Sequence, residues 1–381
     1  MKITCWKWLF AIGLLTATFT NTQAAPPVEE QCQPFPTYFQ YSSSEIRELY
    51  AKNSTERMSN EELMKWDEIA ADLSRKNSVS GVSRMYAYLY TAQKEAAFLS
   101  YISHGQFIGS LGPTSAKVLK LFFPSVPNVD GDEYSEHLAK VVFAKIKQRF
   151  DDESAQMKSY PLAENDPKLK ELPKPYIGLK IASYKPWLLK NPTQFMAPQP
   201  PPQNDPYWEQ QSEIVKKISE NCTEQQVQAA KFWAGEAGPK SGNWMVIVND
   251  YMFSHCVPFS KIVCVRSILA EAGIDIDIAL FYTKYTYVIK RPPTINFTIN
   301  PHIHFPKHPS YPSGHSTWSP ACATILSYYF PEKKEYWFQL AKEAGQSRIW
   351  GGIHYPIDHQ GGWTLGIQLG NAILQSPKLC F

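Results

Sequence analysis

The sequence predicts an all-α protein, built as a helical bundle with N-terminal helical elaborations and a Pro-rich loop segment. Its composition is that of a globular chain, with 44% hydrophobic and 19% charged residues among 381, and this length can bury a substantial core. Apolar residues recur at the spacing of helices in many long segments. No run of alternating strands and no internal repeat is visible, which favours helices throughout.

Residues 1–24 have the pattern of a cleavable secretory signal peptide. Lys2 and Lys7 supply a positive start, and residues 8–19 form a short apolar stretch. Thr22 and Ala24 offer small side chains at the −3 and −1 positions of a cleavage site. A retained membrane anchor is the alternative, but the apolar stretch is shorter than the roughly 20 residues that span a bilayer. We therefore predict a periplasmic or secreted protein with no transmembrane segment after the signal peptide.

The cysteine content agrees with an oxidising compartment. Once Cys5 leaves with the signal peptide, six cysteines remain, enough for up to three disulfides. Cys256 and Cys264 could form a local pair, although their spacing does not establish one. No C-x-x-C pair is present, so no zinc site is predicted. The net charge of +3 falls to +1 without Lys2 and Lys7, which gives no reason to expect a nucleic-acid partner.

Residues 25–206 are predicted to hold the N-terminal helices and the Pro-rich segment. Helical patterns start at Ser44 and Ser59, the second with a capping box in which Glu62 follows three residues after Ser59. Further helices are expected over residues 81–105, apolar on more than one face, and over residues 133–150, which are amphipathic.

The Pro-rich segment from residue 151 to residue 206 could be a linker or a long loop draped over the domain. Draping is favoured because Tyr184, Trp187, Leu188 and Phe195 give the segment apolar side chains to bury. We therefore expect residues 25–206 to pack with the remainder of the chain as one domain.

Residues 207–381 are predicted to form the helical core that carries the chemistry. Helices are expected over residues 223–236, 244–256, 259–290, 313–330, 333–349 and 359–375. Pro292 and Pro293 are predicted to stop the third of these helices, because proline does not continue a helix.

Polar residues stand at the ends of these apolar helices in three segments. In the first, Lys284 and Arg291 are seven residues apart, about two helical turns, so both cations are expected on one helix face. In the second, Ser313, Gly314 and His315 open a helix, where glycine permits close approach and free N–H groups attract anions. Taken alone, these residues could equally be surface cations, a helix N-cap and a core histidine.

The third segment holds Ser347, Arg348, His354 and Asp358. Asp358 lies four residues after His354, so its carboxylate could hold one imidazole nitrogen as N–H and leave the other as a nucleophile or ligand. A hydrogen-bonded structural pair is the alternative. Together the three segments supply cations for an oxyanion, a nucleophile and a proton donor, which phosphoryl transfer requires.

The three segments resemble, without a mismatch, the signature of the type 2 phosphatidic acid phosphatase and vanadium-dependent haloperoxidase superfamily. That signature is K-x6-R-P, then P-S-G-H, then S-R-x5-H-x3-D, met here between Lys284 and Asp358. A looser similarity reaches back to about residue 177 and resembles the exported, haloperoxidase-like branch. The resemblance implies the helical bundle of these acid phosphatases and haloperoxidases, while the lack of a transmembrane series disfavours the integral-membrane lipid phosphatases.

The family likeness also implies a role for each residue. His354 would be the nucleophile that forms a phosphohistidine, Asp358 would orient it, and His315 would protonate the leaving group. The phosphoryl oxygens would be bound by Lys284, Arg291, Ser313, Gly314 and Arg348. In haloperoxidase members the same pocket holds vanadate, so His354 would there ligate vanadium.

His308 keeps the choice between the two activities open. Bromoperoxidase-like members carry a histidine near the vanadate, whereas a loop histidine beside Pro309 is an equally good explanation; His302 and His304 are expected to be loop residues. We predict an exported acid phosphatase that hydrolyses small phosphate monoesters without a metal or cofactor. The alternatives are a haloperoxidase with vanadate as its cofactor and a non-catalytic oxyanion-binding protein.

Overall fold

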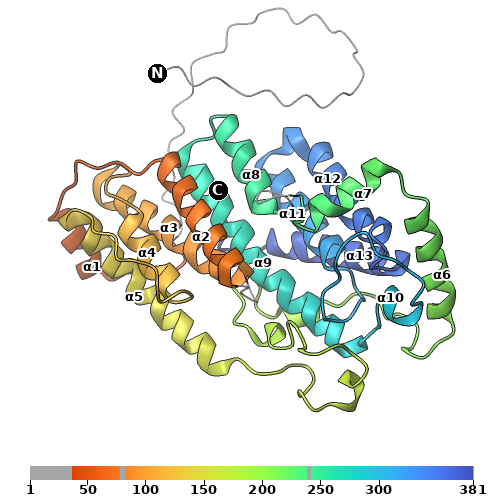
Figure 1. Cartoon of the computed structure of the whole chain (residues 1–381). Coiled ribbons are helices and arrows are strands. Elements are labelled where there is room, and N and C mark those ends of the chain that lie inside the picture. The colour runs from red at the N-terminus through yellow and green to blue at the C-terminus, as the bar shows by residue number, and fades with distance from the viewer. Residues whose placement is uncertain (1–36, 78–81, 238–241, 381) are drawn as a thin grey trace, which may run out of the picture. The chain divides into compact units, whose positions relative to one another are not determined.

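The computed structural model describes residues 37–77, 82–237 and 242–380. The predicted signal peptide and Cys32 lie outside these residues. Within the described ranges the chain is helical apart from loops and one isolated bridge, between Arg57 and Ile108, which confirms the all-α prediction (Figure 1). The α-helices are α1 (Ser43–Tyr50), α2 (Asn60–Asn77), α3 (Val82–His104), α4 (Gly112–Lys120), α5 (Glu133–Gln156), α6 (Tyr207–Glu220), α7 (Glu224–Trp233), α8 (Trp244–Ser254), α9 (Phe259–Tyr287), α10 (Pro292–Ile295), α11 (Gly314–Tyr329), α12 (Lys334–Trp350) and α13 (Pro356–Ile373).

Helix α9 is the central element of the core. Its side chains are buried around almost its whole circumference, as expected for a helix that is apolar on every face. Helices α3, α8, α11 and α13 all contact α9, and Figure 1 shows it crossing the bundle in teal. Since α9 carries Lys284 near its C-terminal end, the core fixes the position of the first signature segment.

Helices α11 and α13 pack closely, and this contact joins the second and third signature segments. Gly366 of α13 lies so near α11 that a Cβ at this position would overlap the backbone carbonyl of Thr317. The backbone N–H of Ser313 also donates to the Asp358 carbonyl at 3.0 Å. The start of α11 is therefore held against the start of α13.

The N-terminal helices confirm the predicted segments, with differences in detail. Ser59 Oγ accepts from the Glu62 N–H at 3.2 Å, as the capping box requires. The Glu62 carboxylate instead accepts from the backbone N–H of Gly112 at 2.8 Å and from the Ser110 hydroxyl. Helices α4 and α6 were not individually predicted, and α5 continues six residues beyond the predicted end.

The Pro-rich segment contains three short 3-10 turns, η1 (Pro167–Leu169), η2 (Ile181–Ser183) and η3 (Pro192–Gln194), and the last two contact α9. Trp187 is buried, and the buried carboxylate of Asp275 accepts the backbone N–H groups of residues 187, 188 and 189 at 2.6 to 2.8 Å. These bonds satisfy loop amides that would otherwise be buried without partners, and they fasten the segment to α9.

The long helix ends earlier than the sequence predicted. Val288 adopts a left-handed conformation with φ of 56° and donates its N–H to the Lys284 carbonyl, which terminates α9 at Tyr287. Pro292 then begins α10 instead of stopping α9, as is common for proline in a first helical turn. Arg291 therefore lies outside α9, and the prediction that Lys284 and Arg291 share one helix face is wrong.

One disulfide is present among the described residues, between Cys264 and Cys380, whose Cα atoms are 6.2 Å apart. The considered pair of Cys256 and Cys264 does not form, because Cys264 is bonded to Cys380; Cys256 is a free, exposed cysteine. In the described ranges, no helix is both long enough and apolar enough to span a bilayer.

Candidate active site

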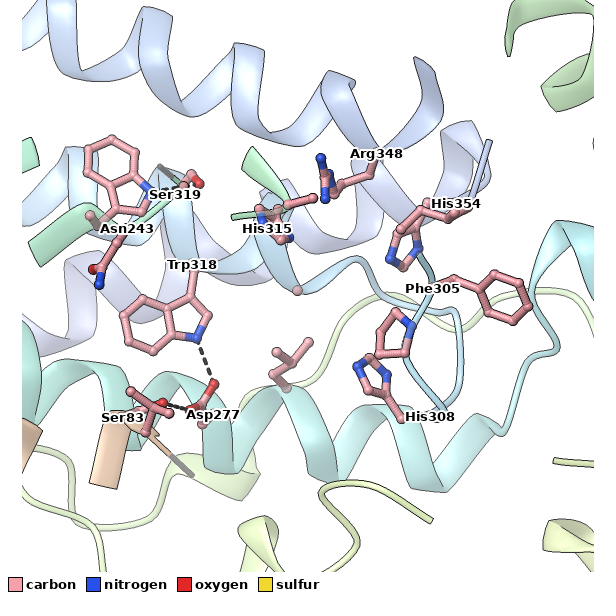
Figure 2. A pocket seen from close by; sticks show the side chains of 18 of the residues that line it. Ser83, Asn243, Asp277, Phe305, His308, His315, Trp318, Ser319, Arg348 and His354 are labelled. Carbon is pink, nitrogen blue, oxygen red and sulfur yellow. Dashed lines mark hydrogen bonds between the residues drawn. The ribbon is translucent and has the colours of Figure 1, made fainter. Parts of the chain in front are cut away.

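A cavity of about 680 Å³ opens between α9, α11, the start of α8 and the loop before α11. Figure 2 shows Arg348, His315, His354 and His308 at one end of this cavity, and Asp277, Ser83 and Asn243 at the other. Of the sequence-predicted site residues, the cavity lining includes Lys284, Arg291, His308, Gly314, His315, Arg348 and His354. Residues from six elements or loops are thus brought to one space although they span seventy positions of the chain.

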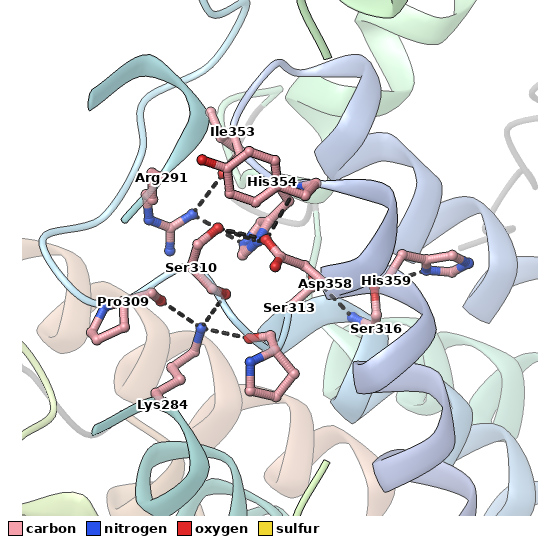
Figure 3. Close-up of polar contacts among 12 residues, drawn as sticks. Lys284, Arg291, Pro309, Ser310, Ser313, Ser316, Ile353, His354, Asp358 and His359 are labelled. Atoms are coloured by element: carbon pink, nitrogen blue, oxygen red, sulfur yellow. Dashed lines mark hydrogen bonds and ion pairs between the residues drawn. The ribbon is translucent and has the colours of Figure 1, made fainter. Parts of the chain in front are cut away.

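Lys284 supports the site through its charge and its contacts with the loop. Its Nζ donates to the backbone carbonyls of Pro309, Ser310 and Pro312 at 2.7, 2.8 and 2.6 Å (Figure 3). An ammonium group has three hydrogens, so all of them are used on the chain in this structure. Burial lowers the pKa of Lys284 well below its ordinary value, and the nearby Arg291 lowers it further.

His354 and Asp358 form the pair that the spacing predicted. His354 precedes α13 and Asp358 lies in its first turn, with His354 Nδ1 2.7 Å from Asp358 Oδ2. His354 Nε2 accepts from Arg291 Nη1 at 3.0 Å, so the hydrogen bonds assign the Nδ1–H tautomer and leave the lone pair on Nε2. Burial lowers the pKa of His354 well below its ordinary value, and Arg291 and Lys284 lower it further. The imidazole is therefore neutral and able to act as a nucleophile.

Ser310 is a site residue that the sequence interpretation missed. Its hydroxyl donates to Asp358 Oδ2 at 2.5 Å and lies 3.3 Å from His354 Nδ1 (Figure 3). Burial raises the pKa of Asp358 to about 6, while the Ser310 hydrogen bond lowers it. Ser310 lies outside the three signature segments, and no local pattern in the sequence distinguished it.

Ser313 and Gly314 occupy different positions relative to the cavity. Ser313 is fully buried, and its Oγ accepts the Ser316 N–H at 3.4 Å. Its side chain therefore acts as the N-cap of α11, the alternative role considered from the sequence. Gly314 is the first residue of α11 and lines the cavity. The N-terminus of α11, which favours anions, therefore borders the cavity at Gly314.

His315 and Arg348 come from α11 and α12 and line the same cavity. His315 Nε2 donates to the Trp233 carbonyl at 2.7 Å. In the neutral ring, Nδ1 is then the nitrogen that carries the lone pair. Arg348 is buried, with Nε donating to Ser347 Oγ at 3.1 Å and Nη2 donating to the Ala230 carbonyl. Burial lowers the pKa of His315 to about 3, with Arg348 as the next cause, and burial lowers that of Arg348 to about 9.

Arg291 and His308 complete the cationic end. Arg291 donates from Nη1 to the Ile353 carbonyl at 3.0 Å and from Nε to the His308 carbonyl at 3.1 Å. The His308 ring reaches the same guanidinium, with Nδ1 3.3 Å from Arg291 Nη2 and 3.1 Å from the Pro309 carbonyl oxygen. His308 is therefore a cavity residue as well as a loop residue. His302 lies elsewhere on the loop and bonds to the Ser219 carbonyl, whereas the exposed His304 lies at the cavity edge.

The electrostatic character of this end is strongly positive. Burial lowers the pKa of Arg291 to about 10, so both arginines stay charged at neutral pH. Neutral histidines and buried cations next to an open volume are the arrangement that an oxyanion would complete.

Comparison with known proteins finds a family match in the C-terminal part of the chain. Residues 262–380 match the model of the PAP2 superfamily. The PAP2 region includes all three signature segments and both disulfide cysteines. Over 73 residues, or 19% of this chain, the sequence is 33% identical to the bacitracin transport permease protein BcrC of Bacillus licheniformis, and the match spans 36% of that protein.

Solved structures show that the fold extends well beyond the PAP2 region. A bacterial vanadium-dependent iodoperoxidase superposes with a TM-score of 0.67 at 20% identity, covering 85% of this chain and 98% of that one. A bacterial vanadium-dependent chloroperoxidase in its apo form gives 0.58 at 13% identity, with 77% and 93% coverage. Its holo form gives 0.52 at 12% identity, with 78% and 83% coverage. At these identities the likeness establishes the vanadium haloperoxidase fold.

Proposed function

We propose that the protein is a phosphatase that hydrolyses phosphate monoesters through a phosphohistidine intermediate. The observation that carries this proposal is the geometry of His354, whose Nδ1 is held by Asp358 while Nε2 carries the lone pair beside Arg291. A buried neutral imidazole with a fixed tautomer is the form needed for nucleophilic attack. No metal or cofactor is required for this reaction.

In the first step, His354 Nε2 attacks phosphorus and forms a P–N bond while the bond to the ester oxygen breaks. The leaving alkoxide takes a proton from His315, and Arg291 and Arg348 stabilise the charge on the phosphoryl oxygens. In the second step water attacks phosphorus, His315 takes its proton, and the P–N bond breaks to release inorganic phosphate. Asp358 stabilises the positive charge that develops on His354 in the first step.

His315 must be protonated to act as the acid, yet its pKa of about 3 leaves it neutral in the ligand-free cavity. A bound phosphate dianion offsets the effect of Arg348, Arg291 and Lys284 on this histidine. We therefore propose that binding of the substrate raises the pKa of His315 and favours the protonated form that acts as the general acid.

The decisive experiment replaces His354 with alanine and follows hydrolysis of a chromogenic phosphate ester. Turnover is expected to fall by at least about a thousandfold, because the nucleophile is lost, while the thermal transition stays cooperative. Trapping of a phosphorylated histidine in rapidly quenched wild-type protein is the positive readout. Retained turnover in the His354→Ala protein would exclude His354 as the nucleophile.

A vanadate-dependent haloperoxidase is the second candidate, and His308 is the observation that favours it. The site fits vanadate, because His354 Nε2 offers a lone pair and buried cations surround it. His354 would bind vanadium, Arg291 and Arg348 would bind its oxygens, and the bound group would activate peroxide for halide oxidation. Incubation of vanadate-treated protein with peroxide and bromide or iodide, beside an ester assay, separates the candidates. Halogenation without ester hydrolysis would reverse their order.

The proposed location is the periplasm or the exterior of the cell, supported by the signal-like residues 1–24 and by the disulfide. Mass spectrometry of the exported protein is expected to give an N-terminus at Ala25. An intact N-terminus in a cytosolic fraction would contradict export.

The non-catalytic alternative predicts a third result. If the wild-type protein binds sulfate but neither hydrolyses esters nor oxidises halide, the non-catalytic alternative would be supported.

A further inference from the structure

Asp277 is a buried carboxylate at the end of the cavity opposite Arg348 and His354 (Figure 2). It is 7% exposed, and it accepts from Ser83 Oγ at 2.7 Å and from Trp318 Nε1 at 2.6 Å. In the described part of the chain, no lysine, arginine or histidine forms an ion pair with it. A buried carboxylate without a cationic partner is unusual, because burial of a charge is costly unless it is paired.

The surroundings of Asp277 indicate a position that contacts a ligand. Four other buried carboxylates are matched by the protein itself: Glu153 pairs with Arg84, Glu271 pairs with Lys94, and Asp275 and Glu95 accept backbone amides. None of these four carboxylates lines the cavity, whereas Asp277 does. Each oxygen of Asp277 has a further lone pair available for a donor.

Aromatic walls connect the two ends of the cavity. Phe281, Tyr86 and Trp318 line it, and Trp318 packs against α9 where Gly273 leaves room for the indole ring, since a Cβ there would overlap it. Asp277 and Lys284 are seven residues apart on α9, which places them about 10 Å apart along the helix axis. A phosphate group alone would leave most of the 680 Å³ unfilled.

We propose that Asp277 binds an ammonium group in the organic part of the substrate, so that the preferred substrates are amine-bearing phosphate monoesters with an apolar spacer. The phosphate would lie among Arg291, Arg348 and His354, and the spacer would lie along the aromatic walls. The cavity is thus complementary to a molecule with an anion at one end and a cation at the other. This inference rests on the proposed function only in that an oxyanion occupies the cationic end.

Calorimetric binding of phosphonates tests the proposal without turnover, because their carbon–phosphorus bond is not an ester bond. The probes are 2-aminoethyl-, 6-aminohexyl- and 8-aminooctylphosphonate, each beside the alkylphosphonate of equal length. Wild-type protein is expected to bind the hexyl or octyl amine at least about tenfold more tightly than its alkyl counterpart, the effect of one hydrogen bond to a charged group. The aminoethyl compound is too short to span about 10 Å and should gain nothing. Equal affinity of amine and alkyl probes at every length would overturn the proposal.

Asp277→Asn keeps the side-chain shape and is expected to reduce the amine preference to about one. Glu236→Gln is the matched control, because Glu236 also lines the cavity but is paired with the exposed His304, at 3.6 Å. It should retain the wild-type preference. A preference that persists in folded Asp277→Asn protein, or disappears in Glu236→Gln protein, would reject Asp277 as the ammonium ligand. If Asp277→Asn fails to fold, the length series in wild-type protein decides alone.

Hydrolysis of 6-aminohexyl phosphate and hexyl phosphate separates this inference from the proposed function. If neither ester is hydrolysed while the amine preference in phosphonate binding persists, the phosphatase proposal fails and the ammonium subsite stands. If both esters are hydrolysed at equal kcat/KM and the phosphonates show no preference, the phosphatase proposal stands and the subsite is wrong.

Discussion

Buried cations are treated differently in two regions of this protein. Around α3, Lys94 Nζ lies 3.2 Å from Glu271 Oε1 and Arg84 Nε lies 2.6 Å from Glu153 Oε2, so each cation faces a carboxylate. In the cavity, Arg348 is equally buried, but its described hydrogen bonds go to the Ala230 carbonyl and the Ser347 hydroxyl. The first region neutralises its charges internally, whereas the second retains positive charge.

We infer that the paired charges maintain the fold, whereas the unpaired charges of the cavity bind an anion. A paired cation that loses its carboxylate leaves an uncompensated buried charge, which is strongly destabilising. A cation that has no carboxylate partner already carries that cost in the ligand-free protein. Its removal should therefore affect anion binding more than folding.

The largest effect on stability is expected for Glu271→Ala. Glu271 Oε1 accepts from Lys94, Thr91 and Ser267, all of which are buried. Its loss should lower the free energy of unfolding by about 3–5 kcal/mol, because Lys94 is left unpaired. Urea denaturation measures this change. A loss below about 1 kcal/mol would mean that Lys94 becomes neutral or finds another partner, and the contrast between the regions would weaken.

Arg348→Met should show the opposite behaviour. Hydrolysis is expected to fall by about 10²–10³ in kcat/KM, the usual loss when a transition-state donor is removed. The free energy of unfolding should change by less than that in Glu271→Ala, because no carboxylate loses its partner. If Arg348→Met unfolds as readily as Glu271→Ala, Arg348 belongs with the structural cations.

Sulfate should stabilise the wild-type protein by occupying the cationic end. At about 100 times its Kd, the linkage relation gives about 2.7 kcal/mol of added stability. Thermal melts across a sulfate series, at constant ionic strength set with chloride, measure the effect. The shift should be reduced in Arg348→Met and retained or enlarged in Glu236→Gln, because Glu236 is a negative charge that acts on Arg348. An equal shift in both variants would indicate a general salt effect.

Binding of sulfate near pH 5 should be accompanied by proton uptake through His315, by at most one proton per site. Its pKa of about 3 in the free cavity, lowered by burial and then by Arg348, is expected to rise when a dianion offsets the cations. The histidine is neutral before binding at this pH and becomes protonated after it, so the sign is uptake. Calorimetry in buffers of different ionisation enthalpy counts the proton, and His315→Gln should abolish the uptake.

The smallest effect is expected for Ser310→Ala. The Ser310 hydrogen bond lowers the pKa of Asp358, so its removal should raise that pKa above its present value of about 6. The carboxylate then protonates at higher pH, and the acid limb of the pH–activity profile moves upward. Ser310→Thr keeps a hydroxyl and serves as the control. An unchanged acid limb in Ser310→Ala would show that Asp358 does not set it.

The helices of the core could be predicted because their apolar periodicity is a local property of the sequence. The end of α9 could not, because a left-handed Val288 is decided by packing, and Pro292 was a stronger local stop signal. Likewise, Glu62 follows the capping-box spacing but bonds to Gly112 from a distant segment.

The members of the site could be identified by their order along the chain, although their contacts could not. The spacing of His354 and Asp358 correctly predicted a direct contact, since four positions bring side chains together even at a helix start. Nothing local indicated that Lys284 would use all its hydrogens on loop carbonyls, or that Ser310 would bind Asp358. In the sequence, Asp277 is one of three acidic residues in a long apolar helix, and nothing distinguishes it from the other two. Only the fold places it in the cavity lining.

The disulfide between Cys264 and Cys380 also determines what a break in the chain would do. The two cysteines are 116 positions apart, and all three signature segments lie inside the covalent ring they close. Phe297, 86% exposed, lies on the surface loop between the first segment and the second. A protease that cut there would convert the ring into two peptides still joined through sulfur, so Arg291 and His354 would remain parts of one molecule. The bond that closes the ring would thus keep the candidate active-site residues covalently connected after such a cut.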